Sequence, residues 1–276
     1  MSDTTTSPAD QLGALPAETG ATALVVAYNG RPFAGFARQP GQHTVQGSLE
    51  AALSTILRRD VVTACAGRTD AGVHALGQVV SFPTFGDEPD DLTLLRSLNA
   101  LVGVDISVRE VRRARQGFSA RFDAVSREYR YRLVSGSVPP LFLSPVAWWV
   151  KKPLDVDAMR AAASHLVGEH DFRSFCVTIS AAGKRTTRRV TSIEIFAEQA
   201  LGEECLTVRV VGNAFLHSMV RTIVGTLVEV GTGRRSPEWV ADALAAQKRA
   251  AAGPTAPANG LTLWSVEYPE DVWLLG

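Results

Sequence analysis

The first hundred or so residues carry a fixed order of periodic segments, and that order restricts the fold more than any other feature. Alternating or apolar stretches predict strands over 22–28, 61–66, 77–83 and 106–111. Helical spacing follows Thr44, and a second helix runs from Asp90 or Asp91 to Leu101. The resulting order, β-α-β-β-α-β, is the split β-α-β arrangement.

The second half repeats this theme with insertions. From Val125 to Leu133, Tyr129 lies on the apolar side of an alternating strand, whereas Glu128 and Arg130 lie on the other side. We expect helices over 155–167, from Asn213 to about 230 and from Ser236-Pro237. Further strands are expected over 172–177, 189–197, 205–211 and 261–268. The sequence thus predicts an α+β protein of two RRM- or ferredoxin-like halves, with adjoining mixed or antiparallel sheets and a cleft between them.

Length and composition agree with this division. A chain of 276 residues with 46% hydrophobic residues can build two packed domains. We place a mobile N-terminal tail over 1–20, an N-terminal domain over 21–116 and a C-terminal domain over 117–276. The start of the chain lacks a basic and apolar signal segment, and no long apolar run predicts a membrane span. A cytoplasmic location is therefore expected by elimination.

The cysteines and histidines do not indicate a metal site. The three cysteines are far apart and form no CxxC pair, so they are expected to be buried thiols in a reducing compartment. Of the five histidines, only His165 and His170 are loosely paired, and a surface or capping role suits them.

Charge is balanced overall but unevenly distributed. The 28 basic and 28 acidic residues give a net charge of zero, which argues mildly against a nucleic-acid partner. Between Arg109 and Arg132, however, eight arginines face three acids, and a second basic cluster spans Lys184 to Arg189. Either these clusters form a positive face or they are solvated surface; the sequence leaves both possibilities open.

A nine-residue run, GRTDAGVHA over 67–75, places one carboxylate, Asp70, in a turn between two glycines. A carboxylate on a loop between strands can project into a cleft and carry chemistry. By itself, the Asp-Ala-Gly pattern is also ordinary turn chemistry, in which Asp70 only caps the bend.

The complete run resembles the active-site segment of the TruA-type tRNA pseudouridine synthases, and four other segments are similar to that family in the same order. They are Tyr28-Asn29-Gly30 with 35–39, Phe118 to Phe122 with 129–131, Asn213 to Arg221, and Gly260-Leu261. Some positions depart from the family pattern: Asn29, Phe36, Ala37, Glu128, Ser218 and Thr262. None of these removes a catalytic group, and Glu128 and Ser218 lie near the regions that are expected to face RNA.

The resemblance implies the pseudouridine synthase fold and a set of site residues. Asp70 would be the catalytic nucleophile or base, and Arg221 the arginine that pairs with it and stabilises its negative charge. Tyr129 would stack on the target uracil, Arg68 would fill the gap left by the flipped uridine, and Leu261, with Leu263, would wall the pocket. Without the resemblance, Arg221 could equally extend outward from its helix, and Tyr129 or Leu261 could be plain core residues.

The implied reaction isomerises uridine in the anticodon stem-loop of tRNA, at positions 38–40, with the protein acting as a homodimer. Because the isomerisation neither gains nor loses atoms or electrons, no redox cofactor, metal or cosubstrate is required. The target base must leave its stack, and the surrounding RNA contacts must offset that cost. Two alternatives stay open: a non-catalytic RNA-binding module with RRM-like domains, and a hydrolase that uses paired carboxylates.

Overall fold

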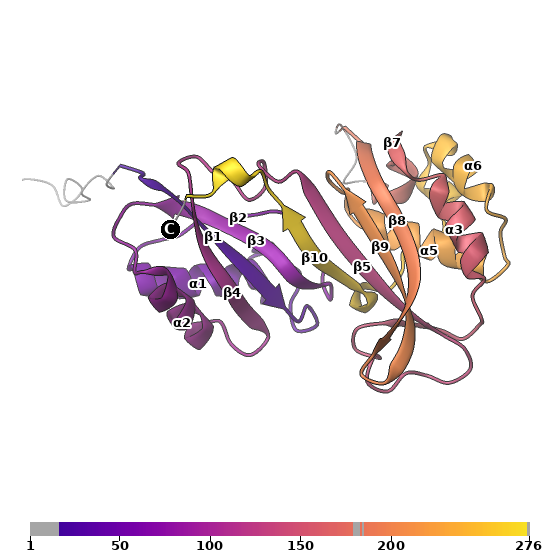
Figure 1. Ribbon diagram of the computed structural model, residues 1–276, viewed down its shortest axis with the longest axis horizontal. Coiled ribbons are helices and arrows are strands. Elements are labelled where there is room, and N and C mark those ends of the chain that lie inside the picture. Colours follow the sequence, from indigo (N-terminus) through magenta and orange to yellow (C-terminus); the bar gives the residue numbers. More distant parts are fainter. Residues whose placement is uncertain (1–16, 179–182, 184, 275–276) are drawn as a thin grey trace, which may run out of the picture.

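A computed structural model describes residues 17–178, 183 and 185–274 (Figure 1). The first half has the predicted element order. Its elements are β1 (Gly20–Tyr28), α1 (Val45–Leu57), β2 (Ala64–Cys65), β3 (His74–Thr84), α2 (Asp91–Leu101) and β4 (Ile106–Ala114). β1 lies between β4 and β3, and β2 pairs with the other edge of β3. Where the sequence predicts a strand over 61–66, the structure has only the two-residue strand β2.

The second half follows the same plan with additional elements. They are β5 (Ser126–Ser135), β6 (Trp148–Val150), α3 (Val156–Ser164), β7 (Gly168–Asp171), β8 (Thr187–Ala200), β9 (Glu203–Gly212), α5 (Met219–Gly231), α6 (Trp239–Ala246) and β10 (Leu261–Glu267). Short 3-10 turns occupy Arg173–Phe175, Arg249–Ala251, Ala258–Gly260 and Glu270–Val272. The strands run in the order β10-β5-β9-β8-β7, so β5 takes the inner position that β1 holds in the first half.

The last strand joins the two halves into one sheet. β10 pairs in parallel with β3, where Thr262 lies opposite His74 and Leu263 opposite Ala75, and it pairs antiparallel with β5 on its other side. Figure 1 shows β10 in yellow between strands of the two halves. The expectation that the two sheets adjoin is confirmed, and the boundary at residues 116 and 117 stays a prediction.

Hydrophobic residues on one face of the sheet pack against the helices of both halves. On β1, Leu24 and Val26 belong to this main core, together with Leu53 of α1 and Ile223 of α5. Figure 1 shows α1 and α5 behind the strands. A smaller cluster covers the opposite face of the N-terminal half, where Ala21, Ala23, Phe118 and Val272 meet. Both faces of β1 are therefore buried, one in the main core and the other in this smaller cluster.

Two side chains cap helices at the places where the sequence predicts that helices begin. The Thr44 hydroxyl accepts a hydrogen bond from the Gly47 amide at 3.2 Å, and the Asp90 carboxylate accepts one from the Thr93 amide at 3.0 Å. These side chains satisfy backbone N–H groups that have no partner inside the first helical turn. The sequence left Asp90 and Asp91 open as the cap of α2, and Asp90 takes that role.

Three expected boundaries are wrong. Asn213 does not cap α5, because its side-chain oxygen accepts a hydrogen bond from the Arg189 amide and secures the end of β9, while the helix begins at Met219. The strand expected over 172–177 is instead β7 followed by a 3-10 turn. Ser236-Pro237 forms a turn, and α6 begins at Trp239.

Two expectations fall partly outside the described residues. Of the predicted tail, Thr19 already bonds to Thr84 and β1 begins at Gly20, while residues 1–16 lie outside the description. Lys184 of the second basic cluster also lies outside it. Within the described part of the chain, no helix is both long and apolar enough to cross a membrane.

Candidate active site

Asp70 lies in the turn between β2 and β3. The turn closes where the Val73 amide donates to the Asp70 carbonyl at 3.1 Å, and Gly72 has a φ of +80°, which favours glycine. A side chain at Gly72 would also lie 3.2 Å from the Ala258 methyl group, which belongs to the segment before β10. The second glycine of the motif therefore allows both the bend and the approach of the C-terminal half.

Buried hydrogen bonds from neighbouring strands hold this turn. Gln78 of β3 is fully buried, and its amide donates to the Gly67 carbonyl at 2.7 Å. The Tyr28 hydroxyl lies 2.7 Å from the Thr69 hydroxyl, and the Phe36 amide donates to the Thr69 carbonyl at 3.0 Å. Since buried polar groups are costly to leave unpaired, these contacts fix the backbone on the N-terminal side of Asp70.

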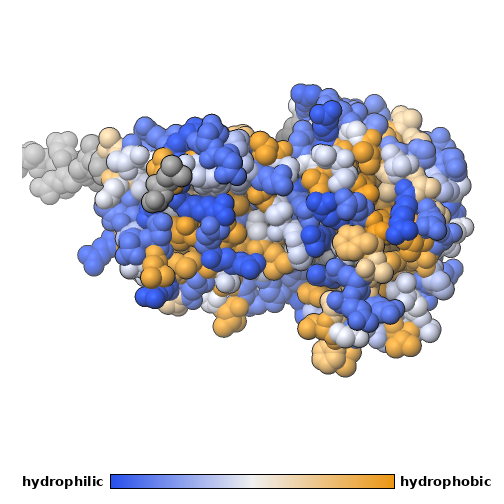
Figure 2. Space-filling model, viewed as in Figure 1, coloured by the Kyte–Doolittle hydropathy of each residue, from blue (hydrophilic) through white to orange (hydrophobic). Residues whose placement is uncertain are grey.

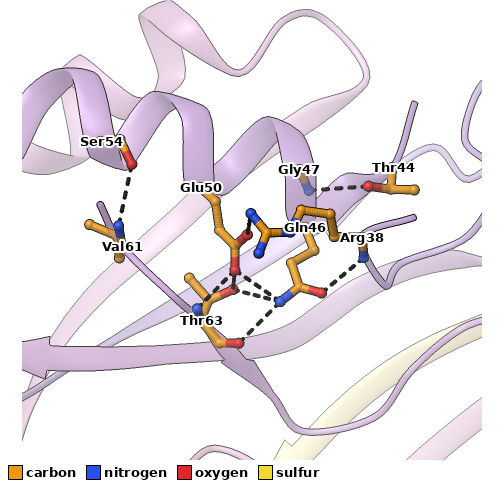
Figure 3. A network of polar contacts seen from close by, with 8 residues as sticks. All are labelled: Arg38, Thr44, Gln46, Gly47, Glu50, Ser54, Val61 and Thr63. Atoms are coloured by element: carbon orange, nitrogen blue, oxygen red, sulfur yellow. Dashed lines mark hydrogen bonds and ion pairs between the residues drawn. The ribbon is translucent and has the colours of Figure 1, made fainter. Parts of the chain in front are cut away.

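A second network supports the segment that leads into β2 (Figure 3). Glu50 of α1 is buried, and one of its carboxylate oxygens accepts hydrogen bonds from the Thr63 amide and hydroxyl and from Gln46 at 2.9–3.0 Å. Its other oxygen lies 3.4 Å from the Arg38 guanidinium. Gln46 also accepts a hydrogen bond from the Arg38 amide at 3.0 Å. The network thus joins α1, the loop before it and the approach to β2.

The Asp70 carboxylate contacts three side chains from the start of α5. Arg221 Nη1 and Ser218 Oγ each donate to Asp70 Oδ2 at 2.8 Å, and His217 Nε2 lies 3.3 Å from Oδ1. The Asp70 side chain is 23% exposed and that of Arg221 is 18% exposed, while His217 is half exposed. A carboxylate of the first half is thereby paired with a guanidinium of the second, 151 residues further along the chain.

Arg221 is oriented by the loop that precedes β10. Its Nε donates to the Ala256 carbonyl at 2.8 Å, and its own carbonyl accepts a hydrogen bond from the Ala256 amide at 3.1 Å. With Nε engaged by the loop and Nη1 by Asp70, the plane of the guanidinium is fixed. Arg221 therefore does not extend into solvent as an unpaired surface arginine would.

Tyr129 lies on the inner face of β5, as the alternation predicts, and is 7% exposed. Its ring meets Phe215 edge to face, with 5.2 Å between the centroids. A Cβ atom at Gly67 would lie 3.3 Å from the Tyr129 hydroxyl, so the ring reaches the first residue of the motif. Burial raises the pKa of this hydroxyl well above its usual value, and the charge of Asp70 adds to the effect.

The other predicted site residues differ in their surroundings. Leu261 is buried at the start of β10 opposite Tyr131, and Leu263 is fully buried opposite Tyr129. Arg68 is exposed next to the Asp70 turn. Burial raises the pKa of the neighbouring Cys65 thiol to about 11, although the charges of Arg68 and Arg121 act against that shift. A cavity of about 460 Å³ elsewhere, lined by Glu229, Trp239 and Pro254 among others, includes none of the predicted site residues.

Arg127 is a structural centre of the site that the sequence did not single out. It is buried, and its guanidinium donates to four backbone carbonyls of three segments, those of Ala66, of Arg121 and Ala124, and of Asn213, at 2.6–3.2 Å. Burial lowers the pKa of this group. One observation could have drawn attention to it: Arg127 is a charged residue on the apolar side of an alternating strand.

Ser218 and His217 were also not predicted as contacts of Asp70. The family pattern singled out Ser218 only as a departure, and the expected helix start at Asn213 would have placed both residues inside the helix. Because α5 instead begins at Met219, both residues lie in the connection that faces the Asp70 turn.

The arginine-rich segment over 109–132 is largely neutralised by neighbouring acids. Five of its eight arginines form ion pairs, with distances of 2.6–2.9 Å: Arg112 with Glu110, Arg113 with Asp91, Arg115 with Asp123, Arg130 with Glu128 and Arg132 with Glu198. Glu128 also pairs with Arg209 at 2.8 Å. Most of this cluster is therefore paired surface rather than a free positive face.

Over most of its length, the chain is similar to one family of known proteins. The family model described as tRNA pseudouridine synthase matches residues 24–123 and 162–269. A tRNA pseudouridine synthase A of Brevibacillus brevis is 46% identical over 245 residues, which cover 88% of this chain and 98% of that protein. The enzyme of the same name from Frankia casuarinae is 44% identical over 255 residues, covering 90% and 89%. A solved H/ACA ribonucleoprotein bound to a substrate RNA aligns only weakly, with 14% identity and a TM-score of 0.34 over 76% of this chain and 44% of that one.

Two split β-α-β halves that share one sheet, with an aspartate of the first half facing an arginine of the second, form the arrangement expected of the pseudouridine synthase class. The extent of the sequence match narrows the class further. The chain belongs to the tRNA pseudouridine synthase family.

Proposed function

We propose that this protein isomerises uridine to pseudouridine in tRNA, with Asp70 as the catalytic carboxylate. Membership of the family makes it an isomerase. The observation that supports Asp70 most directly is the 2.8 Å bond between its Oδ2 and Arg221 Nη1, since this bond holds a partly exposed carboxylate in one orientation.

The reaction needs little else from the protein chemically. The C1′–N1 glycosidic bond of uridine breaks and a C1′–C5 bond forms; C5 loses a proton and N1 gains one, so the atoms balance without a co-reactant. Asp70 acts either by attack on C1′ or by removal of a ribose proton, and both routes require the charged carboxylate. Arg221 stabilises that charge and sets its direction.

The surrounding residues take the roles that the family resemblance implies. Tyr129, buried next to Gly67, stacks on the target uracil, and Leu261 contributes to the wall of its pocket. Arg68 is exposed and free to enter the space that the flipped uridine leaves in the RNA. The proposed targets are uridines 38–40 of the anticodon stem-loop, in the cytoplasm.

We further propose that the protein acts as a homodimer through an apolar patch at one end of the C-terminal half. Val138, Leu141, Phe142 and Leu201 are 61–77% exposed. The Glu203 carboxylate accepts hydrogen bonds from three successive amides over 141–143, so this loop presents its side chains in a fixed arrangement. Figure 2 shows apolar groups at the lower right, where Figure 1 places the loop before β6 and the β8–β9 hairpin. A charge at this patch should separate the two subunits, so Phe142→Asp should lower the molar mass measured by light scattering from that of a dimer to that of a monomer. An unchanged molar mass would show that the proposed interface is wrong.

The decisive experiment is incubation of the purified protein with unmodified tRNA, followed by mass analysis of the product. Isomerised uridine supports the proposal, whereas released uracil indicates a hydrolase and binding without chemistry indicates an RNA-binding module. Asp70→Asn should lower the rate by at least roughly a thousand-fold while tRNA binding survives. Wild-type activity in that variant would exclude Asp70 from the mechanism.

Arg221→Met tests the ion pair separately. Loss of the cation leaves Asp70 unsupported, so the rate should fall strongly while tRNA is still bound. A rate within a few-fold of the wild type would show that the pair is not needed.

A further inference from the structure

Ser218 has an unusual backbone for the start of a helix. Its φ and ψ are +58° and 15°, in the left-handed region, although a residue at this position is normally extended. Three other non-glycine residues in the described part of the chain have positive φ. Arg58 and Gln247 end helices and Leu201 lies in the turn between β8 and β9, which are usual places for this conformation.

The Ser218 side chain does not perform the usual function of a serine before a helix. It makes no capping hydrogen bond to α5, and its hydroxyl donates to Asp70 Oδ2 instead, at 2.8 Å. Arg221, three residues later in the first turn of the helix, donates to the same oxygen. One carboxylate oxygen is therefore held by two donors that a single helical turn places side by side.

The other oxygen of Asp70 is held less firmly. His217 Nε2 is 3.3 Å from Oδ1, and this imidazole is half exposed. A half-exposed side chain can move aside at little cost, whereas Arg221 is held at both ends by Asp70 and Ala256. The contacts thus distinguish the two oxygens: Oδ2 accepts two hydrogen bonds of 2.8 Å from the protein, whereas Oδ1 contacts only the half-exposed His217 at 3.3 Å among the contacts described.

Backbone strain at a non-glycine residue persists only where the surroundings require it. Glycine would adopt the same angles without strain but would bring no hydroxyl. A serine that holds this conformation at the N-cap position of α5, without capping the helix, is explained by the bond that its hydroxyl makes with Asp70. This position is also one of those where the chain departs from the family pattern.

We propose that Ser218 is a positioning residue: together with Arg221 it immobilises Asp70 Oδ2, so that Oδ1 is the oxygen that reacts with the ribose. This inference rests on the proposed function of Asp70 and makes it more specific. It predicts that the hydroxyl contributes to the chemical step and not to folding or to tRNA binding.

Ser218→Gly separates these possibilities, because it removes the hydroxyl and relieves the strain in one change. We expect the melting temperature to stay the same or rise, the Kd for a tRNA transcript to stay within about two-fold, and the single-turnover rate at saturating tRNA to fall by about 10–100-fold. Ser218→Ala should lose the same rate without any rise in melting temperature, since alanine removes the hydroxyl but keeps the strain. Ser218→Asn, which tolerates the left-handed region and offers an amide donor, should recover part of the rate.

Gln247→Gly is the matched control. Gln247 has a φ of +50°, is exposed, and lies at the end of α6, so this change relieves similar strain without touching Asp70. It should leave the rate unchanged. A wild-type rate in Ser218→Gly, or a loss of stability or tRNA binding that accounts for its slower rate, would overturn the positioning role. If Asp70→Asn is inactive while Ser218→Gly is fully active, only the role of Ser218 fails; if the wild type forms no pseudouridine, the proposed function itself fails.

Discussion

A single methyl group placed far from the reacting atoms should disturb the catalytic pair. Gly225, in the middle of α5, faces the segment before β10 so closely that a Cβ atom there would lie 1.8 Å from the Pro254 carbonyl oxygen. A Cβ atom at Gly253 would similarly lie 2.7 Å from Thr226 Cα. The helix and the segment thus touch backbone to backbone, and this same segment carries Ala256, the partner of Arg221.

The expected size of the effect of Gly225→Ala follows from two opposing contributions. Alanine favours a helix over glycine by about 1 kcal/mol, whereas overpacking a tight contact costs about 1–3 kcal/mol. Because the clash is with backbone, the segment must move by more than about 1 Å, and the overpacking cost should lie in the upper part of its range, at about 2–3 kcal/mol. We expect a net loss of about 1–2 kcal/mol in the free energy of unfolding, or about 2–4 °C of melting temperature for each kcal/mol.

The catalytic effect should be larger than the loss of stability suggests. A shift of about 1 Å in Ala256 would break its 2.8 Å bond with Arg221 and turn the guanidinium away from Asp70. Misplacement of this size can cost about 100-fold in rate. The assay is single-turnover formation of pseudouridine in a tRNA transcript, well below the melting temperature, with tRNA binding measured in parallel.

Gly47→Ala in α1 provides a matched comparison. It makes the same substitution near the start of another helix, but its Cβ atom would approach only a side-chain oxygen, Thr44 Oγ1, at 3.0 Å. Its rate should stay close to that of the wild type. If Gly225→Ala folds with wild-type stability and turns over at the wild-type rate, then the contact between α5 and the Pro254 segment does not position Arg221.

Two further predictions concern buried groups near the sheet. Arg127→Lys keeps the charge but cannot supply donors to four separate carbonyls, so the free energy of unfolding measured with urea should fall by about 2–4 kcal/mol; a change below about 0.5 kcal/mol would contradict this role. Burial raises the pKa of the thiols of Cys65 and Cys205 to about 11 and that of Cys176 above its usual value. Cys176 and Cys205 are buried, whereas Cys65 is half-buried. Since a raised pKa keeps a thiol protonated and unreactive, thiol reagents at pH 8 should modify the three cysteines only after unfolding, and rapid labelling of the native protein would contradict this expectation.

The elements that the sequence predicts well are those with local signals. The alternation over 125–133 correctly predicts that Tyr129 faces inward. Thr44 and Asp90 cap their helices through hydrogen bonds to residues only three positions later in the sequence. Asn213 has the same capping chemistry, but a tertiary partner, the Arg189 amide, takes its side chain. Local propensity gives no indication of that competition.

The candidate active site shows the same difference between features with a signal in the sequence and features that depend on tertiary contacts. The family resemblance pointed to Asp70 and Arg221, and the structure places them 2.8 Å apart. No short-range pattern indicates that Ser218 adopts a left-handed backbone or that Arg127 joins three segments, because both features depend on how α5 and β5 meet the N-terminal half. Their roles in turnover stay predictions.

The position of β10 has a consequence for synthesis on the ribosome. The strand that fills the seam between β3 and β5 begins at Leu261, and the residues after it return to the N-terminal half, where Leu274 bonds to Arg113. Protein synthesis proceeds at about 5–20 residues per second, so β10 is completed roughly 10–35 s after β3. Throughout that interval the edges of β3 and β5 that β10 later covers are unpaired. Because an unpaired strand edge can bind other chains, the nascent chain is protected from such pairing only when β10 has been made.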